Sequence, residues 1–357
     1  MNGFFKLVLP LLFSALAAYI ITPVVIKVAH KYKLIDDPKK NKHPKVIHDR
    51  PTPRGGGLAI YLAFASASLI FLPLDKHLVG ILLGAAVLVI TGLLDDRYNL
   101  NPYLRLIIQF FAAALPIASG IGIAFINNPL GGSIDLSLPQ ITFNLLGETR
   151  SIWLLSDMFA LFWIVGLMNI LNMGAKGVDG QLSGVVIISS LVIAILSFKY
   201  SADITEWPVL ILSLIVAGSF LGFLPWHFFP QKIMPGFSGS TLAGFLLAVL
   251  SILTTTKVGT LLVVLGIPIV DTGYTITRRI LSGKSPLWGD TGHLHHKLLA
   301  AGYSKKQVSF IYWGFSLTLG IIALNLNTSF KFYTIIGIVL IVGAMLLWLT
   351  HKPKNNL

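Results

Sequence analysis

The chain has 357 residues, of which 55% are hydrophobic and only 11% are charged. Soluble globular domains carry about 25% charged residues, so the composition excludes a soluble enzyme and predicts a polytopic membrane protein. The chain contains no cysteine, which excludes disulfides, thiolate metal sites and cysteine nucleophiles. The net charge is +13. In a membrane protein, an excess of positive charge is better explained by membrane topology and contact with anionic lipid than by a nucleic-acid partner.

Eleven apolar stretches approach the length of about 20 residues that a helix needs to cross a bilayer core. We therefore predict an all-α protein with about eleven transmembrane helices in a single integral-membrane domain, 1–357. The first stretch is expected to be an uncleaved helix and not a signal peptide, because its apolar run continues well past a cleavage-like site. The glycines, prolines and alternating apolar residues of 126–150 predict a short β-hairpin. The predicted helices are 4–26, 56–74, 78–94, 106–125, 152–172, 183–198, 207–224, 238–254, 258–277, 307–326 and 330–350.

Positive charges indicate the orientation of these helices. Cytoplasmic loops carry an excess of Lys and Arg. If loop 27–54 lies inside, eleven crossings put 21 of the 27 Lys and Arg residues on that side. All the histidines except His77 fall there as well. We therefore predict that the N-terminus is outside, the C-terminus is inside and the hairpin is extracytoplasmic.

The first polar cluster is LLDDRYN at 93–99, where Asp95 and Asp96 end an apolar run. Adjacent carboxylates at a membrane boundary lose hydration and repel each other, so they favour a divalent cation or nearby bases. An oxygen-only pair suits Mg²⁺. The alternative is a solvated helix end without a function. Arg105 follows on the next helix and could bind a phosphate or extend to the membrane surface.

The second cluster is NILNMGAKGVDGQLSG at 169–184, in which Asn169 and Asn172 lie one helical turn apart. Its four glycines break the helix and expose backbone N–H groups, and Asp179 lies among them. A helix break inside a membrane protein usually lines a polar cavity and can bind phosphate through its amides. The alternative is a flexible turn between two helices.

The third cluster is VIHDRPTPRGGG at 46–57, which combines His48 and Arg54 with three glycines before a helix. Free amides at a helix N-terminus attract anions. A basic loop that only follows the positive-inside rule would have the same composition.

The fourth cluster is PIVDTGYTITRRI at 268–280, in which Asp271 lies within an apolar run. An ionisable group in such a position is a functional candidate. The alternative is a structural ion pair between Asp271 and either Arg278 or Arg279.

The fifth cluster is GDTGHLHHKLL at 289–299, which contains His293, His295 and His296, called here the histidine cluster. A closed zinc site usually needs four N or S ligands and a catalytic zinc site a cleaner triad, so zinc is the weaker interpretation. A cationic pocket for a diphosphate, made with Lys297, Arg278 and Arg279, is the better one. The carboxylates gather at cytoplasmic helix ends, which predicts an active site at the membrane surface that meets a cytosolic substrate and a lipid.

Together these five motifs resemble the polyprenyl-phosphate N-acetylhexosamine-1-phosphate transferases. HDRPTPRGGG, DDRYNLNP, NILN with GVDG, PIVDT with RR, and GHLHHKLL occur in the family's order and spacing between about residues 34 and 304. The His-x-His-His form is closer to the GlcNAc-1-phosphate branch than to the phospho-MurNAc-pentapeptide branch, which stays the alternative.

The resemblance implies that a UDP-N-acetylhexosamine, with UDP-GlcNAc favoured, donates its sugar-1-phosphate to a polyprenyl phosphate at the first membrane step of cell-envelope polymer synthesis. UMP leaves, Mg²⁺ is required (with Mn²⁺ as an alternative), and a homodimer is one option for assembly. By position, Asp95 would engage the lipid phosphate as base or orienter, Asp96 would support it or the metal, and Asp179 would face the nucleotide and the metal. The substrate and diphosphate would be held by His48, Arg54, Arg105, Asn169, Asn172, Lys176, Arg279, His293, His295 and His296.

Two departures from the family pattern weaken the expected metal site. Lys176 stands where the family has the first Asp of Asp-Gly-x-Asp-Gly, and Phe237 stands where the family has a metal-binding Asp. The first change adds a positive charge and the second removes an anionic oxygen ligand. Lys176 could bind the diphosphate directly and replace part of the metal's charge, or Asp290 could serve as a ligand.

These departures leave a second hypothesis, a catalytically weak homologue that binds polyprenyl phosphate or UDP-sugar without turnover. A transporter, the third, would place paired charges at the bilayer midplane, and the sequence has no such pattern. The enzyme hypothesis requires that the acidic pair, the glycine-broken segment and the histidine cluster meet in one shallow pocket at the inner face of the bilayer.

Overall fold

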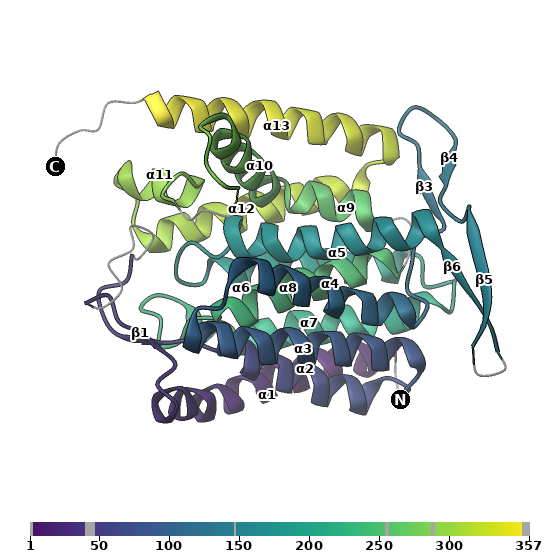
Figure 1. The fold of residues 1–357 in the computed structure, drawn as a ribbon, viewed down its shortest axis with the longest axis horizontal. Coiled ribbons are helices and arrows are strands. Elements are labelled where there is room, and N and C mark those ends of the chain that lie inside the picture. The colour runs from purple at the N-terminus through teal and green to yellow at the C-terminus, as the bar shows by residue number, and fades with distance from the viewer. Residues whose placement is uncertain (1–2, 40–46, 146–147, 254–256, 287–289, 352–357) are drawn as a thin grey trace.

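The computed structural model describes residues 3–39, 47–145, 148–253, 257–286 and 290–351. It is mostly helical, and most of the helices run along one long axis, side by side (Figure 1). The helices are α1 (Gly3–Lys31), α2 (Gly56–Phe71), α3 (Lys76–Tyr98), α4 (Pro102–Ala118), α5 (Leu154–Gly174), α6 (Gln181–Lys199), α7 (Glu206–His227), α8 (Gly236–Ile252), α9 (Lys257–Val264), α10 (Gly266–Leu281), α11 (Leu294–Ala300), α12 (Lys305–Asn325) and α13 (Thr328–His351).

The lengths of these helices make the protein a multi-pass membrane protein. Within the described ranges, seven helices are long and apolar enough to cross a bilayer, and the bent pair α9–α10 makes an eighth if it crosses as one broken span. Three shorter apolar helices, α2, α4 and α8, lie among them. Every backbone polar group of a helix is satisfied internally, which is why helices suit this environment.

The structure differs from the predicted helices at two places. The stretch predicted as one helix, 258–277, is α9 and α10, which meet at an angle of 72°. Pro268 lies in the first turn of α10, where its missing N–H costs nothing, and it could not continue an unbroken helix without losing a hydrogen bond. Helix α4 is Pro102–Ala118 and not 106–125. Asn101 caps its start by accepting a hydrogen bond from the Tyr103 N–H, and the predicted end at 125 was wrong because Phe125 already belongs to a strand.

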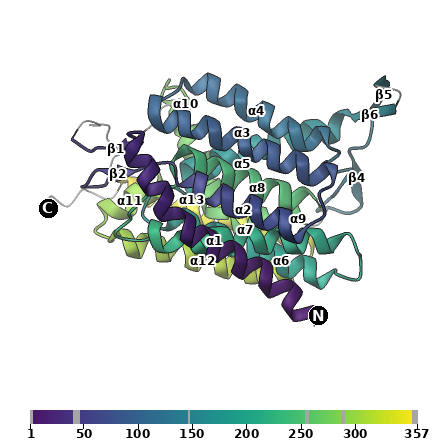
Figure 2. The same cartoon turned by 90° about the horizontal axis from the view of Figure 1, so that it is seen from below.

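Short strands lie at the two ends of the bundle (Figures 1 and 2). Strand β1 (Ile35–Asp36) pairs antiparallel with β2 (Thr52–Pro53). At the other end β3 (Phe125–Asn127) pairs with β4 (Ser133–Asp135), and β5 (Gln140–Leu145) pairs with β6 (Glu148–Trp153). The segment predicted as one short hairpin thus contains two antiparallel pairs. Helix α1 begins at the β5–β6 end, whereas α13 ends at the β1 end (Figure 1).

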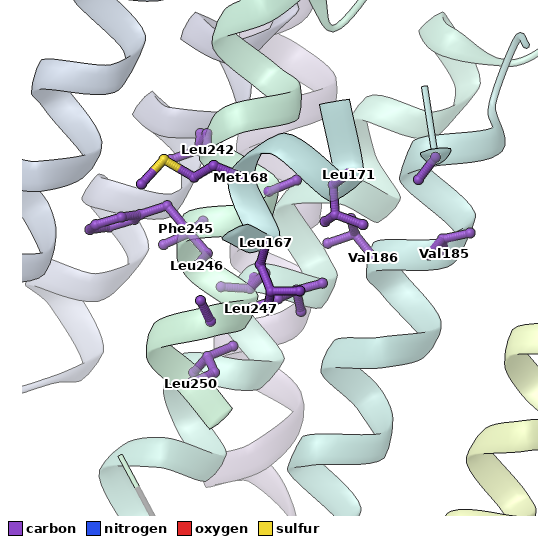
Figure 3. Close-up of a cluster of buried hydrophobic side chains, with 14 of the residues drawn as sticks. Leu167, Met168, Leu171, Val185, Val186, Leu242, Phe245, Leu246, Leu247 and Leu250 are labelled. Carbon is purple, nitrogen blue, oxygen red and sulfur yellow. The ribbon is translucent and has the colours of Figure 1, made fainter. Parts of the chain in front are cut away.

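Helix α8 is the centre of the bundle, since all its residues are buried. Its Leu242, Phe245 and Leu250 pack with side chains of α5 and α6 (Figure 3). Helices α5 and α8 approach closely because Gly244 has no side chain: a Cβ there would lie 2.4 Å from the Met168 Cα. Small residues allow this kind of contact between membrane helices. The N-terminus of α8 is thereby fixed in the interior, at the end of the bundle where the polar motifs meet.

Candidate active site

A cavity of about 810 Å³ lies between the polar ends of several helices. It is lined by the ends of α3 and α5, the starts of α4 and α8, residues of α10 and α11, and the β1–β2 segment. The acidic pair, the glycine-broken segment and the histidine cluster therefore contribute to one cavity. The predicted site residues that line it are His48, Arg54, Asp95, Asp96, Arg105, Asn169, Asn172, Lys176, Arg279, His293, His295 and His296.

Asp95 is held by Arg105, ten residues further along the chain. The Arg105 Nη1 lies 3.2 Å from Asp95 Oδ2, and the Leu100 N–H donates to Asp95 Oδ1 at 3.0 Å. Asp95 is only 6% exposed, which excludes the solvated helix end considered from the sequence. Because the Arg105 side chain is tied to a carboxylate, it is a fixed part of the cavity wall and not a flexible chain extended to the membrane surface.

The Asp96 carboxylate is hydrogen-bonded to the N-terminus of α8. The backbone N–H of Phe237 donates to Asp96 Oδ1 at 3.0 Å, and the Ser238 hydroxyl donates to Oδ2 at 3.3 Å. A carboxylate at this position satisfies an N–H group that has no partner within its own helix and interacts favourably with the helix dipole. Asp96 also interacts electrostatically with Arg54 and Lys176. Its oxygens are thus engaged by protein donors and cations.

The turn before α8 fits closely around this carboxylate. Gly236 has a φ of +70°, and a Cβ at this residue would lie 2.1 Å from Asp96 Oδ2. The next residue, Phe237, offers an aromatic ring, and the guanidinium carbon of Arg105 lies 4.9 Å from the centre of that ring. A cation over an aromatic face is a favourable contact. A cation thus lies over the side chain where the family pattern expects a metal-binding Asp.

Lys176 bridges the glycine-broken segment and α8. Its Nζ donates to Asn172 Oδ1 at 2.8 Å and to the Gly236 carbonyl at 3.4 Å. The same Asn172 oxygen also accepts from the Ser240 hydroxyl at 2.8 Å. The segment is therefore held by specific polar contacts, which excludes the flexible turn considered from the sequence.

An amide pair forms another part of the wall. The Asn169 Nδ2 donates to Gln109 Oε1 at 2.9 Å and also to the Val165 carbonyl. Gln109 is 2% exposed, and its Nε2 has no protein partner among the described residues. The pair joins α4 to α5 and leaves one buried amide donor at the cavity.

Asp179 is the exception among the predicted site residues, because it does not line the cavity. Its Oδ2 accepts from the Gln231 backbone N–H at 3.3 Å, and the carboxylate interacts electrostatically with Lys305. Burial raises the pKa of the Asp179 carboxyl, more than the Lys305 charge and the Gln231 hydrogen bond lower it. The side chain differs from the prediction because its carboxylate is hydrogen-bonded to the segment that follows α7.

Asp271 is the partner of the histidine cluster and not of the arginines. Its Oδ2 lies 2.9 Å from His293 Nδ1, and its Oδ1 accepts from the Leu294 N–H at 2.7 Å. Asp271 is fully buried. It therefore fixes both the His293 ring and the start of α11. The ion pair of Asp271 with Arg278 or Arg279, considered from the sequence, is absent from the described residues.

The other two imidazoles of the cluster are neutral at physiological pH. Burial, followed by the neighbouring imidazoles, lowers the pKa of His295 well below its ordinary value, and burial also lowers the pKa of His296. The His293 and His295 rings stack with centres 5.6 Å apart. The His295 ring also packs on Gly177, where a Cβ would lie 2.1 Å from it. The cluster is thus in direct contact with the glycine-broken segment.

Asp290 holds both arginines of α10. Arg279 donates to its two oxygens at 3.1 and 3.2 Å, and Arg278 donates at 2.5 Å. Burial by itself would raise the pKa of Asp290, but hydrogen bonds from Arg279 and the Gly292 N–H and the charges of both arginines lower it to about 2. Arg279 lines the cavity, whereas Arg278 does not. Lys297, also expected at the diphosphate, donates to the Leu346 carbonyl instead.

The β1–β2 pair brings in a carboxylate that sequence reasoning missed. Arg54 forms an ion pair with Asp36, and the His48 Nε2 lies 3.3 Å from the Asp36 carbonyl. The register pairs Asp36 with Thr52, so the basic motif and Asp36 lie on adjacent strands. The only sequence signal for Asp36 was its place among the charged residues of 31–37. No periodic pattern predicts that this segment pairs with 52–54. Arg54 is thus positioned at the cavity by a specific partner, beyond what the positive-inside rule alone requires.

The described side chains do not fit a metal held jointly by Asp96 and Asp179. No group of three or more His, Asp or Glu side chains with metal-binding geometry occurs in the described parts of the chain. Asp96 is bonded to α8, Asp179 lies outside the cavity lining, and Asp290 is occupied by two arginines. Mg²⁺ requires near-octahedral oxygen ligands, and Lys176 and Arg105 would repel it.

Comparison with known proteins gives the same answer as the motifs. The family model described as Glycosyl transferase family 4 matches residues 78–255. A probable undecaprenyl-phosphate N-acetylglucosaminyl 1-phosphate transferase of Bacillus subtilis is 31% identical over 345 residues, which cover 94% of this chain and 90% of that protein. The chain belongs to glycosyl transferase family 4.

Other members of glycosyl transferase family 4 with curated names are also similar. A decaprenyl-phosphate N-acetylglucosaminephosphotransferase of Mycolicibacterium smegmatis is 28% identical, over 89% of this chain and 81% of that protein. An undecaprenyl-phosphate alpha-N-acetylglucosaminyl 1-phosphate transferase of Escherichia coli K12 is 30% identical, over 79% of this chain and 73% of that protein. The names agree on the GlcNAc-1-phosphate branch that the His-x-His-His motif favours.

Proposed function

We propose that this protein transfers GlcNAc-1-phosphate from UDP-GlcNAc to a polyprenyl phosphate and releases UMP. The observation that carries the proposal is the shared cavity, in which the Asp95–Arg105 pair, Lys176 and the histidine cluster meet. The names of the similar proteins support the same reaction, with undecaprenyl or decaprenyl phosphate as acceptor. Cations and N–H donors facing one cavity are what a reaction between two phosphates needs.

The reaction is a displacement at phosphorus. An oxygen of the polyprenyl phosphate attacks the phosphorus that carries the sugar, and the bond from that phosphorus to the oxygen bridging the two phosphates breaks. The bridging oxygen keeps the electron pair and leaves as part of UMP, so the other product is polyprenyl diphosphoryl-GlcNAc. Catalysis of such a step depends on positioning and on neutralising charge.

The side chains divide between the two substrates. Asp95 holds Arg105 where the guanidinium binds the acceptor phosphate, and its carboxylate takes a proton from the acceptor if the lipid arrives as a monoanion. The histidine cluster and Arg279, which line the same cavity, bind the diphosphate of the donor. His295 and His296, being neutral, donate N–H groups without adding to the charge of the cavity.

The cavity lies at the cytoplasmic face in the topology that we propose. The seven long helices, the bent pair and the three short apolar helices give eleven crossings, which agrees with α1 and α13 having their outer ends on opposite sides of the bundle (Figure 1). The excess of Lys and Arg puts the β1–β2 end inside. The strand pairs of 125–153 are then extracytoplasmic, and the membrane is the cytoplasmic membrane.

A transfer assay in proteoliposomes tests the proposal. Radiolabelled UDP-GlcNAc is supplied with undecaprenyl phosphate, and label is measured in the lipid phase. We expect lipid-linked label with wild type, and none with Asp95→Asn. Asp135→Asn is the matched control, since Asp135 is exposed on β4 at the other end of the bundle.

The same assay separates the alternatives. Label transferred from UDP-MurNAc-pentapeptide and not from UDP-GlcNAc would assign the protein to the peptidoglycan branch. Binding of UDP-GlcNAc without any transfer, under conditions in which a relative from Bacillus subtilis is active, would identify a homologue that binds without turnover.

A further inference from the structure

We propose that the Lys176 ammonium is a tethered cation that replaces a divalent metal in this active site, so that sugar-phosphate transfer needs no added metal ion. The inference rests on the proposed function and concerns how the charge of the reacting phosphates is neutralised. The general principle is that a preorganised positive charge next to a transferring phosphoryl group stabilises its transition state, whether an ion or a side chain supplies it.

Lys176 lies among oxygen atoms as a bound cation would. Its Nζ contacts Asn172 Oδ1 at 2.8 Å and the Gly236 carbonyl at 3.4 Å. Asp96, whose Oδ2 lies against Gly236, interacts with Lys176 electrostatically. The amide oxygen and the carbonyl oxygen are hard ligands of the kind that Mg²⁺ takes in proteins. Here an ammonium group has them.

The neighbouring side chains disfavour a second cation at this place. Arg105 lies over the Phe237 ring, so a guanidinium and an apolar face border the N-terminus of α8. The Asp96 oxygens already accept from Phe237 and Ser238. A divalent ion would have to displace these donors and approach two positive side chains. The ammonium of Lys176, which is attached to the chain, has no such requirement.

Lys176 is also placed to reach the donor substrate. It lines the cavity and is only partly buried, so its ammonium can be reached from the space that the substrates share. The following residue, Gly177, is in contact with the His295 ring. The ammonium therefore lies between the side of the cavity that holds Asp95 and Asp96 and the side that holds the histidine cluster. A diphosphate bound to that cluster lies next to it.

A purely structural role is the competing explanation, because Lys176 also joins the end of α5 to the start of α8. The two roles differ in what they predict for metal. If Lys176 only connects helices, the phosphates still need a cation from solution, and chelation abolishes binding or transfer. If it replaces the cation, chelation leaves both unchanged.

The experiment measures two quantities with and without EDTA on the full-length protein in proteoliposomes. One is transfer of label from UDP-GlcNAc to undecaprenyl phosphate, and the other is equilibrium binding of UDP-GlcNAc, which needs no turnover. For wild type we expect both to be the same in EDTA and in Mg²⁺. Loss of binding or of transfer in EDTA, with recovery on adding Mg²⁺, overturns the inference and leaves the proposed function intact.

Variants of Lys176 identify the group responsible. Lys176→Met keeps the length and removes the charge, and we expect transfer in EDTA to fall about a hundredfold or more, as when one preorganised charge donor is lost. Lys176→Arg is expected to recover part of it. Lys284→Met is the matched control, since Lys284 is exposed beyond the end of α10. Transfer by Lys176→Met equal to wild type in EDTA overturns the inference.

The two proposals fail in different ways. If UDP-GlcNAc binds equally in EDTA and Mg²⁺ and Lys176→Met weakens that binding, but no label enters the lipid in either condition, the transferase function fails and the tethered cation stands. If UDP-GlcNAc binds in neither condition, both fail. Thermal unfolding of each variant, compared with wild type, shows whether the chain is still folded.

Discussion

The Oδ2 atom of Asp271 in α10 lies 2.9 Å from the Nδ1 atom of His293, which immediately precedes α11. The carboxylate accepts a hydrogen bond from the Nδ1–H group. The other ring nitrogen, Nε2, is therefore the one available to a phosphate. Asp271 is thus a positioning residue for the histidine cluster.

We expect Asp271→Asn to lower kcat about 10- to 100-fold with little change in KM, because an amide can donate to Nδ1 and select the wrong tautomer. The measurement is steady-state transfer from UDP-GlcNAc, with thermal unfolding of the same sample. A structural role alone would lower the unfolding temperature without changing kcat per folded molecule. Asp135→Asn serves again as the exposed control.

The neutral, buried His295 predicts how stability depends on pH. Its pKa is lowered well below 6.5 in the folded protein, by burial first and by the neighbouring imidazoles second. The unfolded chain therefore binds a proton below about pH 6.5 that the folded chain excludes, so this contribution to stability is complete above that pH and is lost as the pH falls. We expect the unfolding temperature to decrease from pH 7 to pH 5.

His295→Gln tests the assignment of this effect. Glutamine does not titrate, so we expect the variant to show a smaller decrease in unfolding temperature between pH 7 and pH 5 than wild type does. His77→Gln is the control, because His77 is partly exposed and lies in the first turn of α3, far from the cluster. Equal pH dependence in wild type and His295→Gln would mean that another group is responsible.

The sequence predicted local features of this site well and long-range ones poorly. Asp95 and Arg105 are close in the chain and flank a turn between two helices, so their proximity follows from local structure. The ion pair of Arg54 with Asp36 depends on the pairing of two-residue strands, which have no periodicity to detect. The bend between α9 and α10 was missed because the run is mostly apolar on both sides of it, and only Gly266 and Pro268 mark the place of the break.

The close fit of Gly236 against Asp96 predicts a severe effect of a single methyl group. Gly236 has a φ of +70°, and its Cβ position lies 2.1 Å from Asp96 Oδ2. A side chain in this backbone region costs about 1–3 kcal/mol before any clash is counted. We expect Gly236→Ala to unfold at a lower temperature and to lose transfer, because Asp96 and the Lys176 contact at the Gly236 carbonyl must both shift.

Gly314→Ala is the matched control for this substitution. Gly314 lies in α12, and nothing lies within 4 Å of the position that a Cβ would take. Alanine also favours a helix over glycine by about 1 kcal/mol. The control is therefore expected to be as stable as wild type or more stable, with unchanged transfer. Wild-type behaviour of Gly236→Ala would show that the Asp96 carboxylate is not held as described.

For Asp179, the sequence motif and the cavity predict different effects of substitution on transfer. By its place in the motif Asp179 is catalytic and faces the nucleotide, but its carboxylate accepts from the Gln231 N–H and does not line the cavity. We therefore expect Asp179→Asn to keep transfer within about tenfold of wild type, the size of effect that a lost supporting hydrogen bond produces. Asp95→Asn, measured in parallel, is expected to abolish transfer. Equal loss of activity in both variants would require Asp179 to reach the substrates by a movement that brings its carboxylate past Val178 into the cavity.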